Sequence, residues 1–400
     1  MSCVEKPTWF LYPYIILAAV AAVMLGGCND DLGEDYYFFE PADHYNLVNT
    51  GEGLDLLWTF TPDEQIKNPV VLDGKRAAYF HTPKAVYSVN PADGSLRWRH
   101  PVKNPLLNST EVFIVPYNDL VLIPTETERV LQGVDASTGG VLWTLTFSDH
   151  ISANAGRPQM VGISTDDERA YIVLALHRGT AVVAVDPLSG DVLWKASDDI
   201  RSGLAGYVFQ DREDPFLYVT SGGTTWKLDK ADGRIIDKIE KLWRSTRKPT
   251  YADGIAYTSG GRARAVDLET GRTLWSFRPD ACESEDKRTV FEPPILAGDV
   301  AYLLTACEYV AQVDLESGKQ QWLGELLPIA YSFEPVVTGG YALTAIGDLF
   351  HVDEHDGARE LMLSLSPPEI HLTTYRHLVS DGDILILTPG NNQAFAFKIK

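Results

Sequence analysis

The chain has 400 residues, and 34 Lys and Arg stand against 55 Asp and Glu, which gives a formal net charge of −21. An acidic surface repels nucleic acid and anionic lipid headgroups, so we expect no nucleic-acid partner. Hydrophobic residues make up 45% of the chain, which is ordinary for a globular protein with a large core.

The N-terminus has the pattern of a targeting segment. The apolar run Ile15–Leu25 is followed by Gly-Gly and then Cys28, and such a segment is read as a signal rather than as part of the fold. Leu-Gly-Gly-Cys resembles the bacterial lipoprotein processing box, which implies that Cys28 receives a diacylglycerol. We therefore predict a signal peptide over 1–27 and a lipidated flexible tether over 28–53, with an uncleaved membrane anchor as the alternative.

The predicted lipid anchor decides the expected location. Acyl chains together give stable attachment to a membrane, and no other stretch reaches the roughly 18 apolar residues that span a bilayer. Asn29 follows Cys28, so the strongest inner-membrane retention signal, an Asp at this position, is absent. We expect a protein of the bacterial cell envelope that touches the outer membrane only through its lipid and faces the periplasm or the cell surface.

An eleven-residue pattern recurs along the rest of the chain. Its clearest copy, Ala265–Trp275, has Ala, Asp, Thr, Gly and Trp at positions 1, 3, 6, 7 and 11. Self-similarity at a period of about 40–50 residues indicates a repeat architecture. The seven copies are Ser88–Trp98, Gly133–Trp143, Ala184–Trp194, Lys227–Asp237, Ala265–Trp275, Gln312–Trp322 and His351–Leu361.

Each copy predicts a strand, a tight turn and a second strand. Asp starts the turn because its carboxylate can accept backbone N–H groups two residues on, and Gly takes a positive φ without a steric penalty. Another apolar hairpin precedes each copy, so each unit supplies about four short antiparallel strands, as in a propeller blade.

The two ends of the chain each hold part of an eighth unit. Leu54–Phe60, with Trp58, reads as an outer strand without its blade, whereas residues 378–398 read as three strands without a fourth. Joining them would close the ring and remove exposed sheet edges. We predict an all-β fold over 54–400: an eight-bladed β-propeller of four-stranded antiparallel blades, closed by pairing of the N- and C-terminal strands.

The repeat resembles the tryptophan-docking motif of pyrroloquinoline-quinone-type propellers, and the resemblance covers nearly all of 54–400. It implies that each Trp packs across the neighbouring blade as a structural residue. Asp237 and Leu361 stand where two units would have Trp, so those two interfaces must be held differently. The residues assigned this docking role are Trp58, Trp98, Trp143, Trp194, Trp275 and Trp322.

Two cysteines remain beside Cys3 and Cys28. Cys282 and Cys307 both fall in the sixth unit, and an oxidising envelope compartment permits a disulfide between them. Neither paired Cys nor paired His occurs at the spacing of a zinc site. We therefore predict a disulfide between Cys282 and Cys307 as an option and no metal site.

Quinone-dependent dehydrogenases share this kind of propeller, so enzymatic chemistry has to be considered. In those enzymes the resemblance would include an adjacent Cys-Cys pair, a calcium site of carboxylate and amide ligands, and an Asp base. This chain has no Cys-Cys pair and no Cys-x-x-Cys-His for covalent haem. We expect no enzymatic activity, no catalytic residue and no bound cofactor.

A lipid-tethered eight-bladed propeller without that pocket resembles the BamB-like family of outer-membrane protein assembly lipoproteins. The resemblance implies a scaffold that binds the POTRA domains of a barrel assembly protein. Loops on rigid scaffolds often carry binding function, so the connectors 144–160 and 198–215 are our candidates. A quinoprotein-like redox enzyme or cofactor binder and a surface propeller that binds glycan or peptide are the alternatives.

Overall fold

The computed structural model describes the propeller region and not the residues before it. The described residues are 46–49, 53–66, 70–74, 76–102, 114–125, 129–151, 158–177, 179–196, 207–210, 214–221, 224–240, 248–280, 290, 293–305, 309–325, 330–336, 339–344, 348–366, 377–389 and 392–400.

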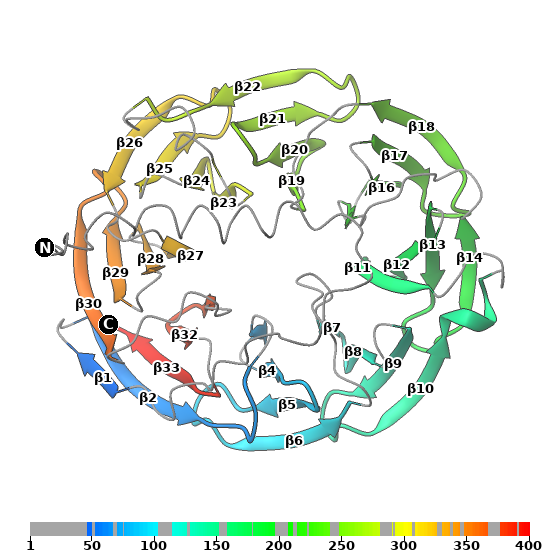
Figure 1. Ribbon diagram of the computed structural model, residues 1–400, viewed down its shortest axis with the longest axis horizontal. Coiled ribbons are helices and arrows are strands. Elements are labelled where there is room, and N and C mark those ends of the chain that lie inside the picture. Colours follow the sequence, from blue (N-terminus) through cyan, green and yellow to red (C-terminus); the bar gives the residue numbers. More distant parts are fainter. Residues whose placement is uncertain are drawn as a thin grey trace, which may run out of the picture. The chain divides into compact units, whose positions relative to one another are not determined.

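Eight antiparallel sheets follow one another around a ring in chain order (Figure 1). The predicted eight-bladed propeller is therefore confirmed. Blade 1 consists of β3 (Val71–Asp73), β4 (Ala77–His81), β5 (Ala85–Val89) and β6 (Leu96–Pro101), and blade 2 consists of β7 (Val115–Tyr117), β8 (Leu120–Thr125), β9 (Val130–Asp135) and β10 (Val141–Thr146). Blade 3 consists of β11 (Gln159–Thr165), β12 (Ala170–Leu176), β13 (Gly179–Val185) and β14 (Val192–Ala196), and blade 4 consists of β15 (Tyr207–Phe209), β16 (Phe216–Ser221), β17 (Thr224–Asp229) and β18 (Ile235–Glu240).

The second half of the ring repeats this arrangement, with the innermost strand of each blade first. One short 3-10 helix, η1 (Phe147–Asp149), follows β10. Blade 5 consists of β19 (Thr250–Ala252), β20 (Ile255–Thr258), β21 (Ala263–Asp267) and β22 (Thr273–Phe277), and blade 6 consists of β23 (Ile295–Ala297), β24 (Val300–Leu304), β25 (Tyr309–Asp314) and β26 (Gln320–Glu325). Blade 7 contains β27 (Ala330–Val336), β28 (Gly339–Thr344), β29 (Asp348–Asp353) and β30 (Arg359–Ser366), and blade 8 consists of β31 (His377–Asp381), β32 (Ile384–Thr388), β33 (Ala394–Ile399) and β2 (Leu54–Phe60).

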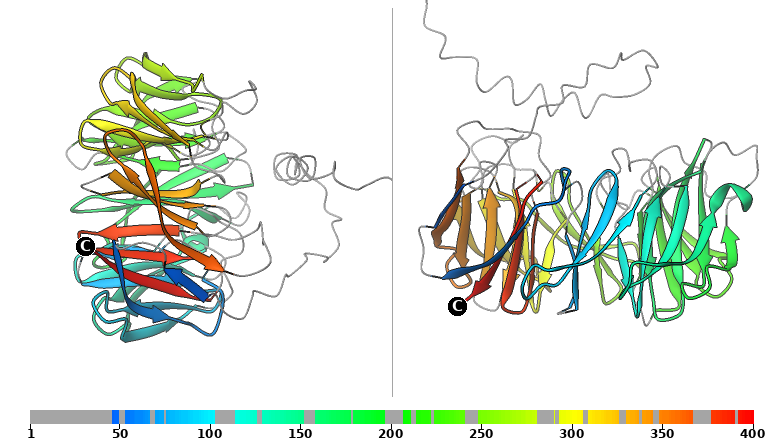
Figure 2. Two further views of the ribbon diagram at one scale, coloured as in Figure 1. Left: turned by 90° about the vertical axis from the view of Figure 1, so that its left-hand side faces the viewer. Right: turned by 90° about the horizontal axis from the view of Figure 1, so that it is seen from below.

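The ring is closed by strands from the two ends of this region. β2 pairs antiparallel with β33, from Leu54 opposite Ile399 to Phe60 opposite Ala394. Figure 2 shows the blue β2 lying against the red strands of blade 8. Trp58 lies opposite Ala396, as expected for the outer strand of a repeat unit. The predicted closure by N- and C-terminal strands is confirmed.

Blade 7 has a fifth strand that the sequence did not reveal. β1 (Asn46–Asn49) pairs antiparallel with the outer edge of β30, from Asn46 opposite Ser366 to Asn49 opposite Leu363. This strand falls inside the range 28–53 for which we expected a flexible tether. A four-residue segment has little strand signal of its own, and β1 exists because β30 offers it a row of unpaired backbone groups.

Burial follows the position of a strand within its blade. All five residues of β4, all five of β5 and all seven of β13 are buried, because both faces of a middle strand pack against neighbouring blades. The outer strand β6 alternates instead, with Trp98 and His100 buried between exposed residues. Continuous apolar runs and alternating runs are the two patterns expected of strands covered on two faces or on one.

The turn of each repeat has the predicted conformation. The seven motif glycines have φ between 67° and 80°. At one of them, Asp267 accepts the N–H of Thr270 at 2.7 Å, and the N–H of Gly271 donates to the carbonyl of Asp267 at 2.8 Å. These repeat turns join the third and fourth strands of a blade, and they lie at the same end of the ring as the turns that join the first and second strands. We call this end the turn face and the opposite end the connector face. The turns 166–169 and 229–233 both lie on the turn face.

Candidate functional site

The motif tryptophans all make the same contact with the next blade. Each indole N–H donates to the backbone carbonyl at position 4 of the next repeat. The pairs are Trp58 with Pro91, Trp98 with Ala136, Trp143 with Pro187, Trp194 with Lys230, Trp275 with Leu315 and Trp322 with Glu354, at 2.7 to 2.9 Å.

The same rings cover the motif glycine of the next blade. A Cβ atom on Gly318 would lie 2.5 Å from the ring of Trp275, and one on Gly94 would lie 2.7 Å from the ring of Trp58. Glycine is therefore required at this position for two reasons: the backbone has a positive φ, and the indole ring lies too close for a side chain. These contacts account for six of the eight blade interfaces.

The interface between blades 4 and 5 has no tryptophan at the motif position, because Asp237 stands in its place. An aromatic cluster fills this interface from the inner side. Phe209 stacks on Tyr218 with ring centroids 5.5 Å apart, and Tyr251 of blade 5 lies within 5.9 Å of both rings. Near the rim, Ile239 lies against Gly271 in place of an indole. Aromatic pairs of this geometry stabilise beyond the area they bury.

The interface between blades 7 and 8 also lacks the motif tryptophan, because Leu361 replaces it. Here a cluster of buried aliphatic and aromatic side chains joins the two blades, including Met362 and Leu363 of β30 and Leu378 of β31. Closer to the axis, Glu334 accepts the N–H and the hydroxyl of Ser380 at 3.1 and 2.8 Å. Burial raises the pKa of the Glu334 carboxyl.

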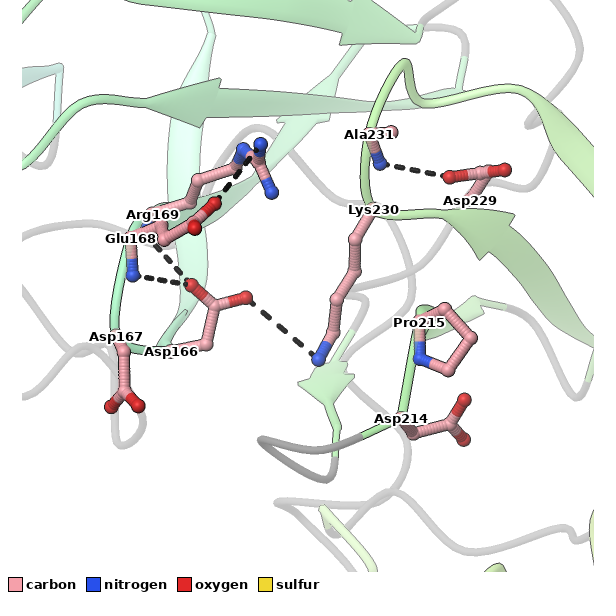
Figure 3. A pocket seen from close by; sticks show the side chains of 9 residues that line it. All are labelled: Asp166, Asp167, Glu168, Arg169, Asp214, Pro215, Asp229, Lys230 and Ala231. Carbon is pink, nitrogen blue, oxygen red and sulfur yellow. Dashed lines mark hydrogen bonds and ion pairs between the residues drawn. The ribbon is translucent and has the colours of Figure 1, made fainter.

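A pocket of about 360 Å³ opens on the turn face between blades 3 and 4 (Figure 3). It is bounded by the β11–β12 turn, by the residues before β16 and by the repeat turn that follows β17. The lining residues are Asp166, Asp167, Glu168, Arg169, Asp214, Pro215, Asp229, Lys230 and Ala231. Two adjacent blades therefore contribute to one site.

Asp166 and Lys230 form the inner wall of this pocket. Asp166 is only 9% exposed and Lys230 only 5%, and the Lys230 Nζ lies 3.7 Å from the Asp166 Oδ2. The other carboxylate oxygen accepts the N–H groups of Glu168 and Arg169, at 3.0 and 2.8 Å. Buried charges need partners of this kind. The Tyr171 hydroxyl donates to Oδ2 at 2.7 Å, and burial, together with this hydrogen bond, raises the pKa of Tyr171.

The wall is coupled to the docking contacts. The carbonyl of Lys230 accepts the indole N–H of Trp194, and its own N–H donates to the carbonyl of Pro215 at 3.0 Å. Asp214 accepts the N–H of Phe216 at 3.0 Å, and its second oxygen lies 3.4 Å from the Tyr251 hydroxyl. The pocket is thus built on the contacts that join blades 3, 4 and 5.

The pocket is acidic. Five carboxylates line it against two cationic side chains. One of these cations, Arg169, lies 3.3 Å from Glu168, and the other is Lys230 beside Asp166. Figure 3 shows Asp167 and Asp214 on opposite sides of the Asp166–Lys230 pair. Such an arrangement favours a cationic group, a Lys or Arg side chain of another protein, over an anion.

Several residues singled out in the sequence fall outside this pocket. Cys28, Cys282 and Cys307 lie outside the described residues. Of the candidate connector 144–160, the structure describes 144–151 and 158–160, and of 198–215 it describes 207–210 and 214–215. Only the last two residues of these connectors line the pocket.

Sequence reasoning missed the pocket for a physical reason. Its residues come from turns about 60 positions apart that only the ring brings together, since Asp166 and Lys230 belong to different blades. One signal was present. Position 4 of the repeat is Pro, Ala or Leu in five copies, Glu354 in the seventh and Lys230 in the fourth, so the fourth copy alone places a cation beside a docking tryptophan.

In the part of the chain that the structure describes, no helix has the length and apolarity needed to cross a membrane. Among the same residues, no three His, Cys, Asp or Glu side chains stand together as a metal site.

A curated relative contradicts the prediction that the chain is not an enzyme. The polyvinylalcohol dehydrogenase of Sphingopyxis sp. (strain 113P3) is 23% identical over 252 residues, which is 56% of this chain and 35% of the relative. The chain thus spans about a third of that relative's length. The prediction failed because it excluded a class on missing local motifs, whereas the repeats themselves are shared with members of that class.

Solved structures with the same fold include an alcohol dehydrogenase and an outer-membrane protein assembly factor. The quinohemoprotein alcohol dehydrogenase of Comamonas testosteroni superposes with a TM-score of 0.64 and 12% identity, over 86% of this chain and 76% of that one. BamB from Moraxella catarrhalis superposes with a TM-score of 0.50 and 14% identity, over 72% of this chain and 96% of that one. At these identities the likeness shows the fold alone.

The sequence family is more specific. The profile of the family described as outer membrane protein assembly factor BamB matches residues 49–205 and 217–395, which is most of the propeller. The resemblance of the tryptophan-docking repeats to this family is confirmed, and the association of that family with the bacterial envelope applies to the chain. The chain belongs to the family of the outer membrane protein assembly factor BamB.

Proposed function

We propose that this chain is a lipid-anchored scaffold of the bacterial envelope that takes part in assembling outer-membrane β-barrel proteins. Its partner is a protein of the envelope, the POTRA domains of a barrel assembly protein being the first candidate. The observation that carries the proposal is the family match over both halves of the propeller. The proposed anchor is Cys28, and Asn29 in place of an Asp directly after it favours the outer membrane.

The acidic pocket between blades 3 and 4 is the docking site in this proposal. Its wall is held by contacts across the blade interface, because Lys230 contacts both Trp194 and Asp166 of blade 3. Its rim carries Asp167 and Glu168, both exposed. Fixed carboxylates suit a basic side chain of a partner domain, since charge complementarity mainly sets specificity and association rate.

A binding measurement tests this proposal. Purified POTRA domains are titrated against the mature chain by calorimetry, and against the charge-reversal variant Asp167→Lys. We expect the variant to bind at least tenfold more weakly, with an effect that shrinks at high salt. Glu316→Lys is the matched control, because Glu316 is an exposed acid of the turn face in blade 6. Equal affinities of Asp167→Lys and the control would reject the pocket as the docking site.

A second candidate is a dehydrogenase of the quinone-dependent class, which the polyvinylalcohol dehydrogenase relative favours. The described residues do not fit the quinone and calcium of that class. Among the described residues, no three His, Cys, Asp or Glu side chains stand together as a metal site. The pocket between blades 3 and 4 is lined by five carboxylates, which repel an anionic cofactor. Oxidation of polyvinyl alcohol by the chain after incubation with the quinone and calcium would favour this candidate over the scaffold.

A further inference from the structure

The chain before β1 leaves the ring at the connector-face end of blade 7. β30 is the fourth strand of its blade and runs from a repeat turn, on the turn face, toward the connector face. Asn46 lies opposite Ser366, the last residue of β30, and Asn49 lies opposite Leu363 (Figure 1). β1 therefore starts near the connector face and runs toward the turn face.

Without β1 the same chain would leave the ring at the opposite end. β2 begins with Leu54 opposite Ile399, the last residue of β33, at the turn face. Two contacts of Lys400 hold this start in place: its backbone N–H donates to the carbonyl of Gly53 at 3.1 Å, and its Nζ lies 2.8 Å from the Asp55 Oδ1. β1 thus reverses the end of the ring from which the N-terminal part of the chain departs.

The distance between the two ends of the ring is large compared with the length of the preceding chain. β2 has seven residues and so extends about 23 Å from the turn face toward the connector face. The proposed anchor, Cys28, is separated from Asn46 by residues 29–45, which span at most about 60 Å when fully extended. The end at which the chain departs therefore influences strongly which face lies nearer to the anchor.

Charge also distinguishes the two faces. The turns of all eight blades on the turn face contain exposed Asp or Glu side chains, for example Asp93 in blade 1, Glu316 in blade 6 and Asp383 in blade 8. In the described turns of this face, exposed Arg or Lys side chains occur in four blades only. They are Arg76, Arg234, Arg272 and Lys319. The turn face is therefore acidic all the way around the ring.

The described part of the connector face has mixed charge. Exposed Lys84, Lys248 and Arg262 lie at this end of the ring, together with exposed acids such as Asp149 and Asp280. A layer of anionic lipid headgroups repels an acidic face, and it repels a face of mixed charge much less. The charge distribution therefore favours the same orientation as the point at which the chain departs.

We propose that the connector face is the surface of the anchored ring that faces the membrane, and that β1 sets this orientation. The proposal rests on the proposed function, because it needs the lipid anchor at Cys28, and it adds how the ring is held. The facing surface is a layer of anionic lipid headgroups. In this orientation the acidic pocket between blades 3 and 4, which lies on the turn face, opens away from the membrane and toward soluble domains of a partner.

Energy transfer to labelled lipids tests the orientation. The chain is purified from bacterial membranes and incorporated into vesicles of phosphatidylethanolamine and phosphatidylglycerol that contain an acceptor-labelled lipid. A fluorescent amino acid replaces Arg262, exposed on the connector face of blade 5, or Glu316, exposed on the turn face of the neighbouring blade 6. We expect at least twofold greater transfer from position 262. High salt should reduce this difference, because it screens the repulsion of the turn face.

A pair of β1 variants tests the role of this strand. Successive N–H groups of a strand point to opposite sides, so replacing both Leu47 and Val48 with Pro removes a donor to β30 whichever residue supplies it. We expect this variant to bring the transfer from positions 262 and 316 close to equality. Replacing the same two residues with Ile is the control, because it keeps both N–H groups, and the twofold difference should remain.

Three results would overturn the proposal: equal transfer from the two positions in the unmodified chain, greater transfer from position 316, or an unchanged difference in the double proline variant. A chain that does not bind the vesicles would reject the anchor at Cys28 and this orientation with it. If the chain binds the vesicles without a preferred face, and POTRA domains still bind more weakly to Asp167→Lys, the proposed function stands and only the orientation is rejected.

Discussion

The indole N–H of Trp275 donates to the backbone carbonyl of Leu315, 2.8 Å away and 40 residues later in the chain. Trp275 is 7% exposed, and its ring lies against Gly318 of the same blade as Leu315. One side chain thus supplies apolar burial, a hydrogen bond and the register between two blades. Five other tryptophans repeat this relationship around the ring.

Replacing Trp275 with Ala should destabilise the propeller by about 3–5 kcal/mol, because it removes the burial of a large aromatic ring and leaves a cavity. Chemical unfolding followed by circular dichroism measures this loss. Leu274→Ala is the control, since Leu274 is 51% exposed and should change the free energy of unfolding by less than about 0.5 kcal/mol. Equal effects of the two substitutions would argue against the docking role.

Gly318→Ala tests the same contact from the other blade. An alanine there would have a φ of 67° and a Cβ atom 2.5 Å from the Trp275 ring. Gly298 has a φ of 57° with no atom near its Cβ position, so Gly298→Ala isolates the backbone strain. We expect Gly298→Ala to cost about 1–2 kcal/mol and Gly318→Ala about 1–3 kcal/mol more. Thermal unfolding of both variants under identical conditions gives the comparison.

His81 should make stability depend on pH. Burial lowers its pKa from 6.5 to about 4, so the folded state binds this proton less readily than the unfolded state. The contribution of neutral His81 is therefore complete above pH 6.5 and is lost as pH falls toward 4. It amounts to about 3 kcal/mol. Urea unfolding between pH 7 and pH 4.5 should show a shallower slope for His81→Gln. An unchanged slope would contradict this assignment.

β1 should protect the end of β30. Val48→Pro removes a backbone N–H from β1 and fixes its φ, so we expect faster hydrogen–deuterium exchange at 363–366, where β1 pairs. Exchange in β29, on the other side of β30, should change less. If exchange at 363–366 stays the same, the fifth strand does not contribute to blade 7.

The sequence was sufficient for the ring and insufficient for the site. The repeat of Asp, Gly and Trp predicted the turns, the blade count and the closure, because each of these is a local pattern that recurs. β1 was missed because its pairing depends on the edge of β30. The pocket was missed because Asp166 and Lys230 meet only across a blade interface, and the aromatic replacement of a tryptophan at Tyr218 and Tyr251 has no motif.

The most direct test of the proposed function is crosslinking in living cells. The protein, with a photoreactive residue at position 168 on the pocket rim, is crosslinked in cells, purified and analysed by mass spectrometry. Crosslinks to a POTRA-containing barrel assembly protein, reduced by Asp167→Lys and not by Glu316→Lys, are the predicted result. Crosslinks only to other envelope proteins, or oxidation of polyvinyl alcohol by cells in a manner that requires this chain, would contradict the assembly scaffold.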